Sequence, residues 1–586
     1  MNHIQKWLKN RYDALYNQFG TGEFTREDAV TALSDYKDDP KKVSAILSEL
    51  RKAGLVEVEL NPADNRARIY RLVKIEDIIR ESLSPEGADM KGEELYGLLK
   101  KAADLIRTRV DYKFILILLF LKRLSDKWEG EYEAKVRELT EMGLSEEDAK
   151  EEAKAKDYHQ FNLPPEYLWE NLRKDVKHLP ERLSEAIKYI AEMNPDLKGI
   201  FDTIEFTSFT GNPENLIILN QLMELFSSKK LHDTSSDILG DAYEWVLRYF
   251  APQKAKEGEV YTPREVIDLL VEVLAPEPET SVYDPTSGSG GMLIGAYKYV
   301  EREYGREGAK KLFLYGQEVN PTTYGLCKMN VYMHDIGDPK IERGDTLLYP
   351  KFRDENGGLK RFDRVIANPP WNQDGYGEET LKEGEFYKKR FSYGYPPKQS
   401  ADWAWIQHML ASTKDGGKVG IVLDNGALFR SGKEKTIRKG VLEDNLLECV
   451  ILLPEKLFYN TGAPGAILVF NKAKDAERRD KVLFINAAQE FVKHPDVRKL
   501  NMLGPENIRR IAEAYRDFAE EEGFSRAVPM EEIKENDYNL NVTLYVFPEE
   551  EVEDIDVNKE WRELREIEER ISQVEERIEG YLEELG

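Results

Sequence analysis

The sequence predicts a multidomain protein built around an α/β domain, with an all-α domain before it, a winged-helix-like segment at the N-terminus and a coiled-coil helix at the C-terminus. A chain of 586 residues is too long for a single hydrophobic core, since such cores stop growing at roughly 250–300 residues. From about 259 to 488, short runs rich in Val, Ile and Phe alternate with helical stretches, as they do around a mostly parallel sheet. From 94 to about 250, apolar residues recur every three or four positions, which is typical of helices.

Composition excludes several classes of protein. Hydrophobic residues make up 41% of the chain, which is ordinary for a globular protein, and no apolar run approaches the roughly 18–20 residues of a membrane span. The start, MNHIQKWLKN, has no signal-peptide apolar region. The two cysteines, Cys327 and Cys449, are far apart and outside any metal-ligand spacing, which favours a reducing compartment. We therefore expect a cytoplasmic protein without a metal site or membrane contact.

Five regions are assigned along the chain: a winged helix-turn-helix-like segment (1–80), an all-α domain (90–250), an α/β domain (255–490), a C-terminal extension (491–550) and a coiled-coil helix (557–585). The last of these is predicted because apolar residues fall on the a and d positions of a heptad while nearly all other positions are charged. These positions are Val557, Leu564, Ile567, Ile571, Val574, Ile578, Tyr581 and Leu585. A stripe this narrow needs a partner, which is either another protein or the surface of this chain.

The N-terminal segment shows the order of a winged helix. Helical patterns cover 4–18, 29–33 and 40–53, and two β-rich runs, LVEVEL and ARIYRLV, follow with the turn-prone NPADN between them. Such a module serves nucleic-acid contact or protein docking, and the sequence leaves both alternatives open. The basic residues available for nucleic-acid contact are Lys41, Lys42, Arg66, Arg68 and Arg71.

A glycine-rich turn lies early in the α/β domain, where a short strand from Ser281 runs into a turn and then into a helix that starts near Met292. Glycines allow a ligand to approach the backbone closely, and the helix N-terminus offers free N–H groups. The candidate binding residues are Asp284, Thr286, Ser287, Gly288, Ser289, Gly290 and Gly291. Alone, such a loop is equally compatible with a structural turn.

Two acids follow at predicted strand ends. Glu318 ends the apolar run that begins at Leu312, and a carboxylate at the end of the second strand can accept both ribose hydroxyl protons. Asp345 follows Gly344 in a similar position. Either carboxylate alone is more often a helix cap, so the evidence is their order after the glycine turn.

The most informative motif is Asn368-Pro369-Pro370-Trp371, which directly follows an apolar strand. The prolines end the strand and make the loop rigid. The side-chain carbonyl of Asn368 and a backbone carbonyl form two acceptors, which match the two N–H donors of a primary amine. Trp371 offers a flat surface on which a base could stack, worth about 1–3 kcal/mol.

These motifs together resemble the amino-methyltransferase family. Asp284 to Gly291 is similar to its cofactor loop, Tyr261-Thr262-Pro263 looks like its additional cofactor motif, and Asn368 to Trp371 is similar to its Asn/Asp/Ser-Pro-Pro-aromatic catalytic motif. The resemblance implies a Rossmann-like methyltransferase domain that binds S-adenosyl-L-methionine. Asn at the first catalytic position favours adenine N6, and Trp371 departs from the commoner Tyr or Phe.

Four further segments resemble the modification subunits of type I restriction-modification systems: 105–128, 391–410, 426–438 and 453–472. This resemblance implies duplex DNA with a flipped adenine as substrate, a specificity subunit bound through the C-terminal helix, a restriction or motor subunit, and two copies per complex. The net charge of −26 argues against a surface that grips DNA throughout. If DNA is the substrate, either a local basic surface or a basic partner must therefore hold it.

Other interpretations remain open. A protein glutamine methyltransferase uses a similar motif, because a carboxamide also presents an NH2 group. A stand-alone methyltransferase needs a recognition domain, for which little chain remains after 488, and a winged-helix regulator with a decayed enzyme fold is a further alternative. No Pro-Cys pair occurs, which argues against cytosine-C5 chemistry. The polar segment 373–399, which follows the catalytic motif, is expected to be a mobile loop that orders over DNA.

Overall fold

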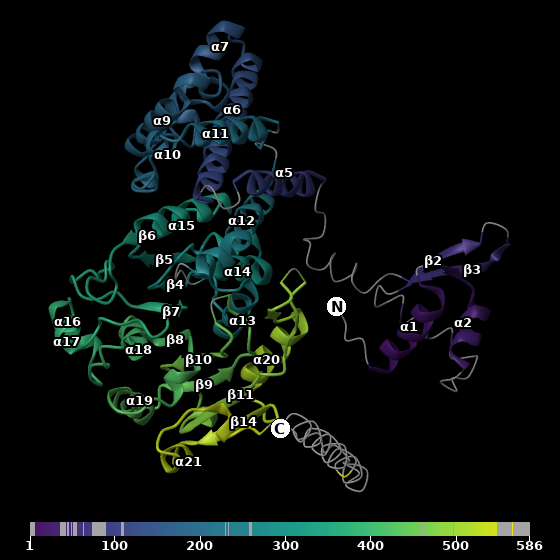
Figure 1. The fold of residues 1–586 in the computed structure, drawn as a ribbon, viewed down its shortest axis with the longest axis vertical. Coiled ribbons are helices and arrows are strands. Elements are labelled where there is room, and N and C mark those ends of the chain that lie inside the picture. Colours follow the sequence, from purple (N-terminus) through teal and green to yellow (C-terminus); the bar gives the residue numbers. More distant parts are fainter. Residues whose placement is uncertain are drawn as a thin grey trace, which may run out of the picture. The chain divides into compact units, whose positions relative to one another are not determined.

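The computed structural model describes residues 6–20, 22–34, 43, 46–47, 50, 56–61, 64–72, 90–106, 111–228, 230–231, 234–256, 261–459, 461–495, 497–547 and 565. The chain divides into two compact units, 1–101 and 102–586, which are described separately (Figure 1). Helix α5 (Met90–Ile106) crosses the division.

The first unit contains helices packed on a small antiparallel sheet. Its elements are α1 (Lys6–Phe19), β1 (Glu23–Phe24), α2 (Arg26–Ala32), β2 (Val56–Asn61) and β3 (Asp64–Leu72), and the strand order is β1-β3-β2. Thr25 and Asp28 form a capping box that starts α2, as the cap at Thr25 predicts.

The first helix and the β2–β3 hairpin of the predicted winged helix are therefore present, whereas most of the predicted helix 40–53, with Lys41 and Lys42, lies outside the described residues. So do the side chains of Arg66 and Arg68. Arg71 forms an ion pair with Glu23 at 2.5 Å. The winged-helix assignment stays a prediction.

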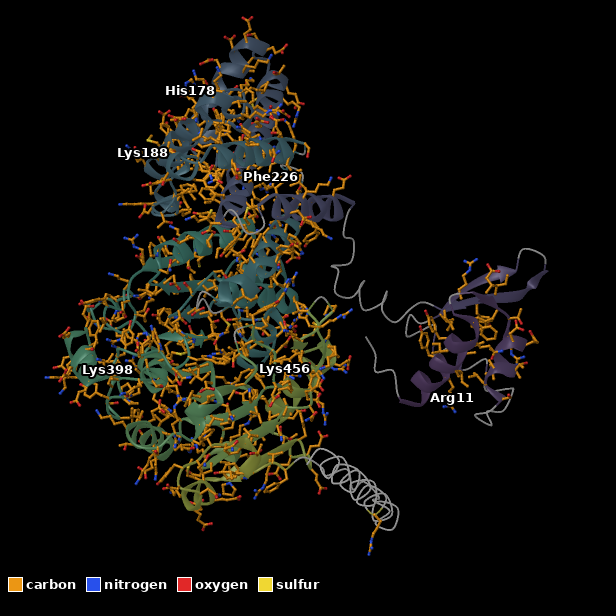
Figure 2. The ribbon with its side chains drawn as sticks, in the orientation of Figure 1. Arg11, His178, Lys188, Phe226, Lys398 and Lys456 are labelled. Carbon is orange, nitrogen blue, oxygen red and sulfur yellow. The ribbon has the colours of Figure 1, made fainter. Side chains whose placement is uncertain are left out.

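The second unit begins with a helical region. Its helices are α6 (Lys113–Glu141), α7 (Glu146–Glu152), α8 (Trp169–Leu172), α9 (Leu179–Met193), α10 (Phe206–Phe209), α11 (Pro213–Ser227) and α12 (Ser236–Lys256). The apolar run 114–121 is buried along α6, and Phe226, labelled in Figure 2, packs edge-on against Trp169 in the same region. Within the described residues, no helix is long and apolar enough to cross a membrane.

A nine-stranded sheet follows, in the order β14-β11-β9-β10-β8-β7-β4-β5-β6. The strands are β4 (Ser281–Asp284), β5 (Phe313–Glu318), β6 (Lys340–Arg343), β7 (Phe362–Ala367), β8 (Thr413–Asp424), β9 (Leu447–Leu452), β10 (Gly465–Asn471), β11 (Lys481–Asn486) and β14 (Ser525–Pro529). Strands β6, β5, β4, β7 and β8 pair in parallel. The sheet is mixed overall, because β10 lies antiparallel between β8 and β9, and β14 lies antiparallel on β11.

Two buried apolar clusters cover the two faces of this sheet. One contains residues of α13 (Arg264–Leu274), α14 (Gly291–Ala309), α15 (Pro321–Met333) and α20 (Pro505–Asp517). The other contains residues of α18 (Asp402–Ala411), α19 (Lys433–Glu443) and α21 (Met530–Glu535). This is the layered α/β arrangement that the alternation of strand and helix patterns predicts.

The chain beyond 490 adds to the same sheet, since β14 pairs with β11 and α20 packs against α13. A minor ladder joins β12 (Val492–Lys493) to β13 (Asn501–Met502). Of the predicted coiled-coil helix, only Arg565 is among the described residues. The coiled coil therefore remains a prediction.

The segment 373–399 differs from the loop expected there. It contains two short helices, α16 (Glu378–Glu383) and α17 (Tyr387–Arg390), and it buries Leu381 and Arg390. The Arg390 guanidinium donates to the backbone carbonyls of Thr346 and Leu347, so a charged side chain anchors the segment. The polar composition of the segment gives no hydrophobic pattern from which this packing could be predicted.

Candidate active site

The candidate site lies where the order of the strands reverses. Strand β4 pairs in parallel with β5 on one side and with β7 on the other, so the loops that leave β4 and β7 meet at one edge. Ligands bind in open α/β sheets at such a switch point. A cavity of about 300 Å³ opens here, and it is lined by residues at the carboxyl ends of β4, β5, β6 and β7, among them Thr286, Gly288, Glu318, Asp345 and Asn368. A smaller cavity of about 70 Å³ adjoins the glycine turn, is lined also by Thr262, and shares Gly288 and Asn368 with the larger one.

The glycine turn has the backbone that its sequence predicts. Gly288 and Gly290 have φ values of +52° and +88°, a left-handed region that glycine adopts without strain. A Cβ at Gly290 would lie 3.0 Å from Cys327 Sγ, so a side chain at this position would also be crowded. Gly290 caps α14, which begins at Gly291, close to the predicted start. The glycine backbone of the turn therefore allows a ligand to approach it closely.

Asp284 ends β4 and is buried beneath this turn. Its Oδ1 accepts a hydrogen bond from Thr286 N at 2.9 Å. Burial, together with a smaller contribution from the nearby negative charge of Glu318, raises the pKa of the Asp284 carboxyl to about 7. The group would ionise more readily if a cation came to lie beside it.

Glu318 and Asp345 both reach the larger cavity, as predicted. Glu318 Oε2 accepts from Gly288 N at 3.0 Å, and its Oε1 accepts from Asn320 N at 2.7 Å. The carboxylate therefore ties the glycine turn to the end of β5. An ionised carboxylate has about four acceptor positions, so further donors can still bind to it.

Asp345 has a partner that sequence reasoning missed. Its Oδ1 accepts from Leu348 N at 3.1 Å, and its Oδ2 accepts from the Tyr376 hydroxyl at 2.8 Å. Tyr376 also lines the cavity. The only sequence signal is an aromatic residue within the polar segment that follows the catalytic motif.

The side-chain amide of Asn368 is held from both ends. Asn368 Nδ2 donates to Thr262 Oγ1 at 2.9 Å, and Asn368 Oδ1 accepts from Trp371 Nε1 at 2.9 Å. Asn368 is 8% exposed, and both Asn368 and Pro370 line the larger cavity. An amide oxygen has two lone pairs, so Oδ1 can accept a second hydrogen bond from a substrate amine. Two motifs that are about a hundred residues apart thus build one acceptor.

Trp371 has a different environment from the open stacking surface that its position suggests. It packs edge-on against Phe458 at 4.7 Å between ring centres and contacts both apolar clusters. Its indole nitrogen is also 3.3 Å from the Val422 carbonyl oxygen. Neither Trp371 nor Pro369 lines the two cavities. A second aromatic pair, Tyr261 with Tyr459, lies edge-on at 6.0 Å.

The remaining predicted residues occupy supporting positions. Tyr261 and Thr262 line the cavities, whereas Pro263 is the N-cap residue of α13 and does not. Ser287, Ser289 and Gly291 line the smaller cavity. Among the residues that the structure describes, no group of three or more His, Cys, Asp or Glu side chains is placed to hold a metal ion.

Comparisons with known proteins show the family to which this chain is similar. The N-6 DNA Methylase family model matches residues 234–554, and the HsdM N-terminal domain model matches residues 97–226. The type I restriction enzyme MjaVIII methylase subunit of Methanocaldococcus jannaschii is 44% identical over 100% of this chain and 99% of its own. The MpnII methylase subunit of Mycoplasma pneumoniae is 30% identical over 68% of this chain and 77% of its own.

Among solved structures, the type I restriction-modification system methyltransferase subunit from Streptococcus thermophilus aligns with a TM-score of 0.67 at 28% identity. That alignment covers 78% of this chain and all of the other. The fold and the site define a class, the adenine-specific N-6 DNA methyltransferases. Within it, the chain belongs to the methylase subunits of type I restriction-modification enzymes.

Proposed function

We propose that this chain transfers a methyl group from S-adenosyl-L-methionine to N6 of an adenine that has been flipped out of a DNA site. The observation that carries the proposal is the buried Asn368 amide, which is held by Thr262 and Trp371 and lines a cavity that the glycine turn also lines. An adenine inside a duplex cannot reach such a recessed acceptor, and flipping it out costs a few kcal/mol.

The residues at the cavity fit this cofactor. Gly288 and Gly290 in the turn 284–291 have no side chain, so a ligand can approach the backbone closely. Glu318 would accept hydrogen bonds from the ribose hydroxyls and Asp345 from the amino group of the cofactor's adenine, with Tyr261 and Thr262 covering the site. When bound, the cofactor supplies an electrophilic methyl group on a sulfonium centre.

Asn368 would then act mainly by positioning the target amine. Its Oδ1, together with the Pro369 carbonyl, accepts the two N–H groups of the target amine and makes the nitrogen lone pair more available. Positive charge develops on that nitrogen during attack, so both hydrogen bonds strengthen in the transition state. Pro370 keeps the loop rigid, and Trp371 keeps the amide oriented.

The test compares Asn368→Ala with Asn368→Asp in the full chain assembled with its specificity subunit. Alanine removes the acceptor and should abolish methyl transfer to DNA, whereas aspartate keeps an acceptor and should retain part of it. Calorimetry should show nearly unchanged S-adenosyl-L-methionine affinity for both variants. Wild-type turnover by Asn368→Ala, or transfer of labelled methyl to protein instead of DNA, would overturn the proposal.

We also propose the partners that membership of this family suggests. These are DNA, a specificity subunit bound through the predicted helix 557–585, a restriction or motor subunit, and a second copy of this chain. With a net charge of −26, the chain benefits from a partner that grips the duplex. Deleting the residues after Asp556 should leave cofactor binding intact but lose the complex. Wild-type co-purification of the truncated chain would contradict this.

A further inference from the structure

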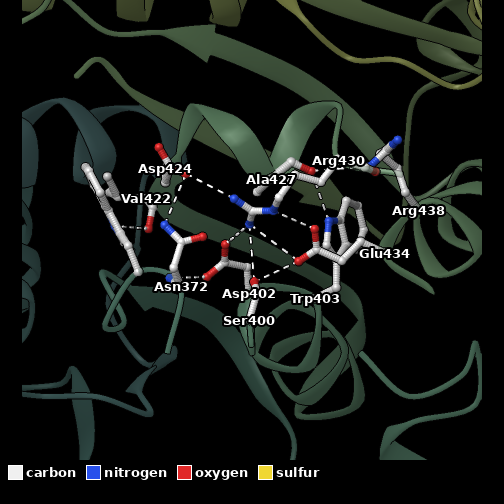
Figure 3. Close-up of polar contacts among 11 residues, drawn as sticks. Asn372, Ser400, Asp402, Trp403, Val422, Asp424, Ala427, Arg430, Glu434 and Arg438 are labelled. Carbon is white, nitrogen blue, oxygen red and sulfur yellow. Dashed lines mark hydrogen bonds and ion pairs between the residues drawn. The ribbon is translucent and has the colours of Figure 1, made fainter. Parts of the chain in front are cut away.

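A cluster of charged side chains lies at the carboxyl end of β8, beside the catalytic loop (Figure 3). Its centre is the Arg430 guanidinium. Arg430 Nε donates to Glu434 Oε2 at 2.6 Å, and Arg430 Nη1 donates to Asp424 Oδ2 at 3.0 Å. Arg430 Nη2 donates to Asp402, and to Ser400 Oγ at 3.2 Å. One side chain thus joins β8 to the starts of α18 and α19.

Two of these acids lead directly to the catalytic loop. Asp402 Oδ1 accepts from the backbone N–H of Asn372 at 3.0 Å, and Asp424 Oδ2 accepts from Asn372 Nδ2 at 3.2 Å. Asn372 immediately follows Trp371, whose indole donates to Asn368. The chain of contacts therefore runs from Arg430 through two carboxylates to the residue next to the catalytic motif.

The backbone at Asn372 explains why this support is needed. Its φ is +52°, in the left-handed region that residues with a side chain rarely adopt. Asparagine tolerates this region better than most residues, but such a conformation persists only where the surroundings hold it. Here the hydrogen bonds to Asp402 and Asp424 hold both the backbone and the side chain of Asn372.

The charges in the cluster are arranged for geometry more than for stability. Asp402 is fully buried and Glu434 is 1% exposed, so both carboxylates have lost their hydration. Apolar residues of similar size are often at least as stabilising as buried ion pairs. A guanidinium, however, presents several donors in a fixed plane and can set the relative positions of several acids.

We propose that Arg430 is a positioning residue for methyl transfer, which holds Asn372 through Asp402 and Asp424 and thereby sets the orientation of Trp371 and Asn368. The inference rests on the proposed function, because it assigns the Asn368 amide as the acceptor of the target amine. It adds a residue far along the chain from the motif, on the segment after β8.

The experiment measures kcat, KM for DNA, cofactor affinity and thermal unfolding for the full chain with its specificity subunit. Arg430→Lys keeps the charge but cannot hold Asp402 and Asp424 together, so kcat should fall about ten- to hundredfold. KM and cofactor affinity should stay within about twofold. The matched control is Arg478→Lys, because Arg478 also pairs with a fully buried acid, Glu448 at 3.6 Å. It should lower the unfolding temperature and leave kcat unchanged.

Asn372→Asp is the second variant, and since Asn372 is exposed, it should fold like wild type. It replaces the NH2 donor with a carboxylate that repels Asp424, so kcat should fall. Asp424→Asn in the same chain restores a donor and should recover part of the loss.

The kcat values of these variants are compared with those of the wild type and of Asn368→Ala. Wild-type kcat for both Arg430→Lys and Asn372→Asp, with Asn368→Ala inactive, would overturn the inference and leave the proposed function standing. An active Asn368→Ala would instead overturn the proposed function. If Arg430→Lys fails to fold, the inference is tested by Asn372→Asp and by its recovery with Asp424→Asn.

Discussion

Replacing Trp371 with phenylalanine tests how the catalytic amide is oriented. By shape alone the change is mild, because phenylalanine also stacks, and the sequence predicts that activity survives. The structure changes this expectation, because Trp371 Nε1 donates to Asn368 Oδ1 at 2.9 Å. Thr262 at the other end cannot select the orientation, since a hydroxyl donates or accepts equally well, whereas the indole N–H can only donate. Without Trp371, the Asn368 amide can turn its NH2 group toward the substrate.

The size of the effect follows from one lost hydrogen bond. A neutral hydrogen bond contributes about 0.5–1.5 kcal/mol net, which corresponds to roughly a two- to tenfold change in rate. Asn368→Ala removes a hydrogen bond that strengthens as charge develops on the amine, so its rate should fall by at least about a hundredfold, to no detectable methyl transfer. Trp371→Phe should therefore lie clearly between wild type and Asn368→Ala.

The assay is single-turnover methyl transfer to DNA at saturating S-adenosyl-L-methionine, with cofactor affinity measured by calorimetry. The matched control is Trp169→Phe, because Trp169 is also buried and its indole donates to Ser227 Oγ at 2.8 Å in the helical region. The control should lose stability without losing rate. A folded Trp371→Phe that transfers methyl at the wild-type rate would refute the orienting role of the indole.

Three further predictions concern the cofactor side of the site. Glu318→Gln replaces an ionised acceptor by a neutral amide at the Gly288 backbone, and calorimetry should show roughly tenfold weaker S-adenosyl-L-methionine binding; unchanged affinity would contradict the assignment. Gly290→Ala forces a side chain into φ +88° and against Cys327 Sγ, so it should lower both the unfolding temperature and cofactor affinity, and a neutral outcome would mean that the turn relaxes freely. Burial raises the pKa of Asp284 from 3.8 to about 7. The protonated carboxyl is therefore favoured in the folded protein, and the stability that it contributes is fully present below pH 3.8 and is lost as the pH rises through about 7. Asp284→Asn should flatten that part of the pH profile of the unfolding temperature.

The local elements of the catalytic half could be predicted because their signals are local. Two prolines after an apolar run end β7 at Ala367, and glycines after Asp284 end β4 and open α14. The acids were expected at strand ends, and parallel strands bring their carboxyl ends to one edge of a sheet. Glu318, Asp345 and Asn368 consequently line one cavity.

The parts that could not be predicted depend on distant contacts. Strand β10 inserts between β8 and β9, and no periodicity within its seven residues indicates an antiparallel partner. Arg390 and Arg430 are charged residues in polar segments, so composition suggests that both are solvated. In the structure one anchors the segment 373–399 and the other organises three acids. Hydrophobic patterns do not detect polar clusters of this kind.

The topology explains why the motifs occur in this order along the chain. Strand β4 lies between β5 and β7, so the chain leaves β4 on one side to build Glu318 and Asp345, and returns on the other side to build Asn368. The acids proposed to bind the cofactor and the proposed amine acceptor therefore come from opposite sides of one strand. Thr262, which precedes the whole sheet, reaches the acceptor across 106 residues and joins the two halves. The position of Asn368 thus depends on the order β7-β4-β5 within the sheet, and the positioning role proposed for Arg430 acts on it from the β8 side.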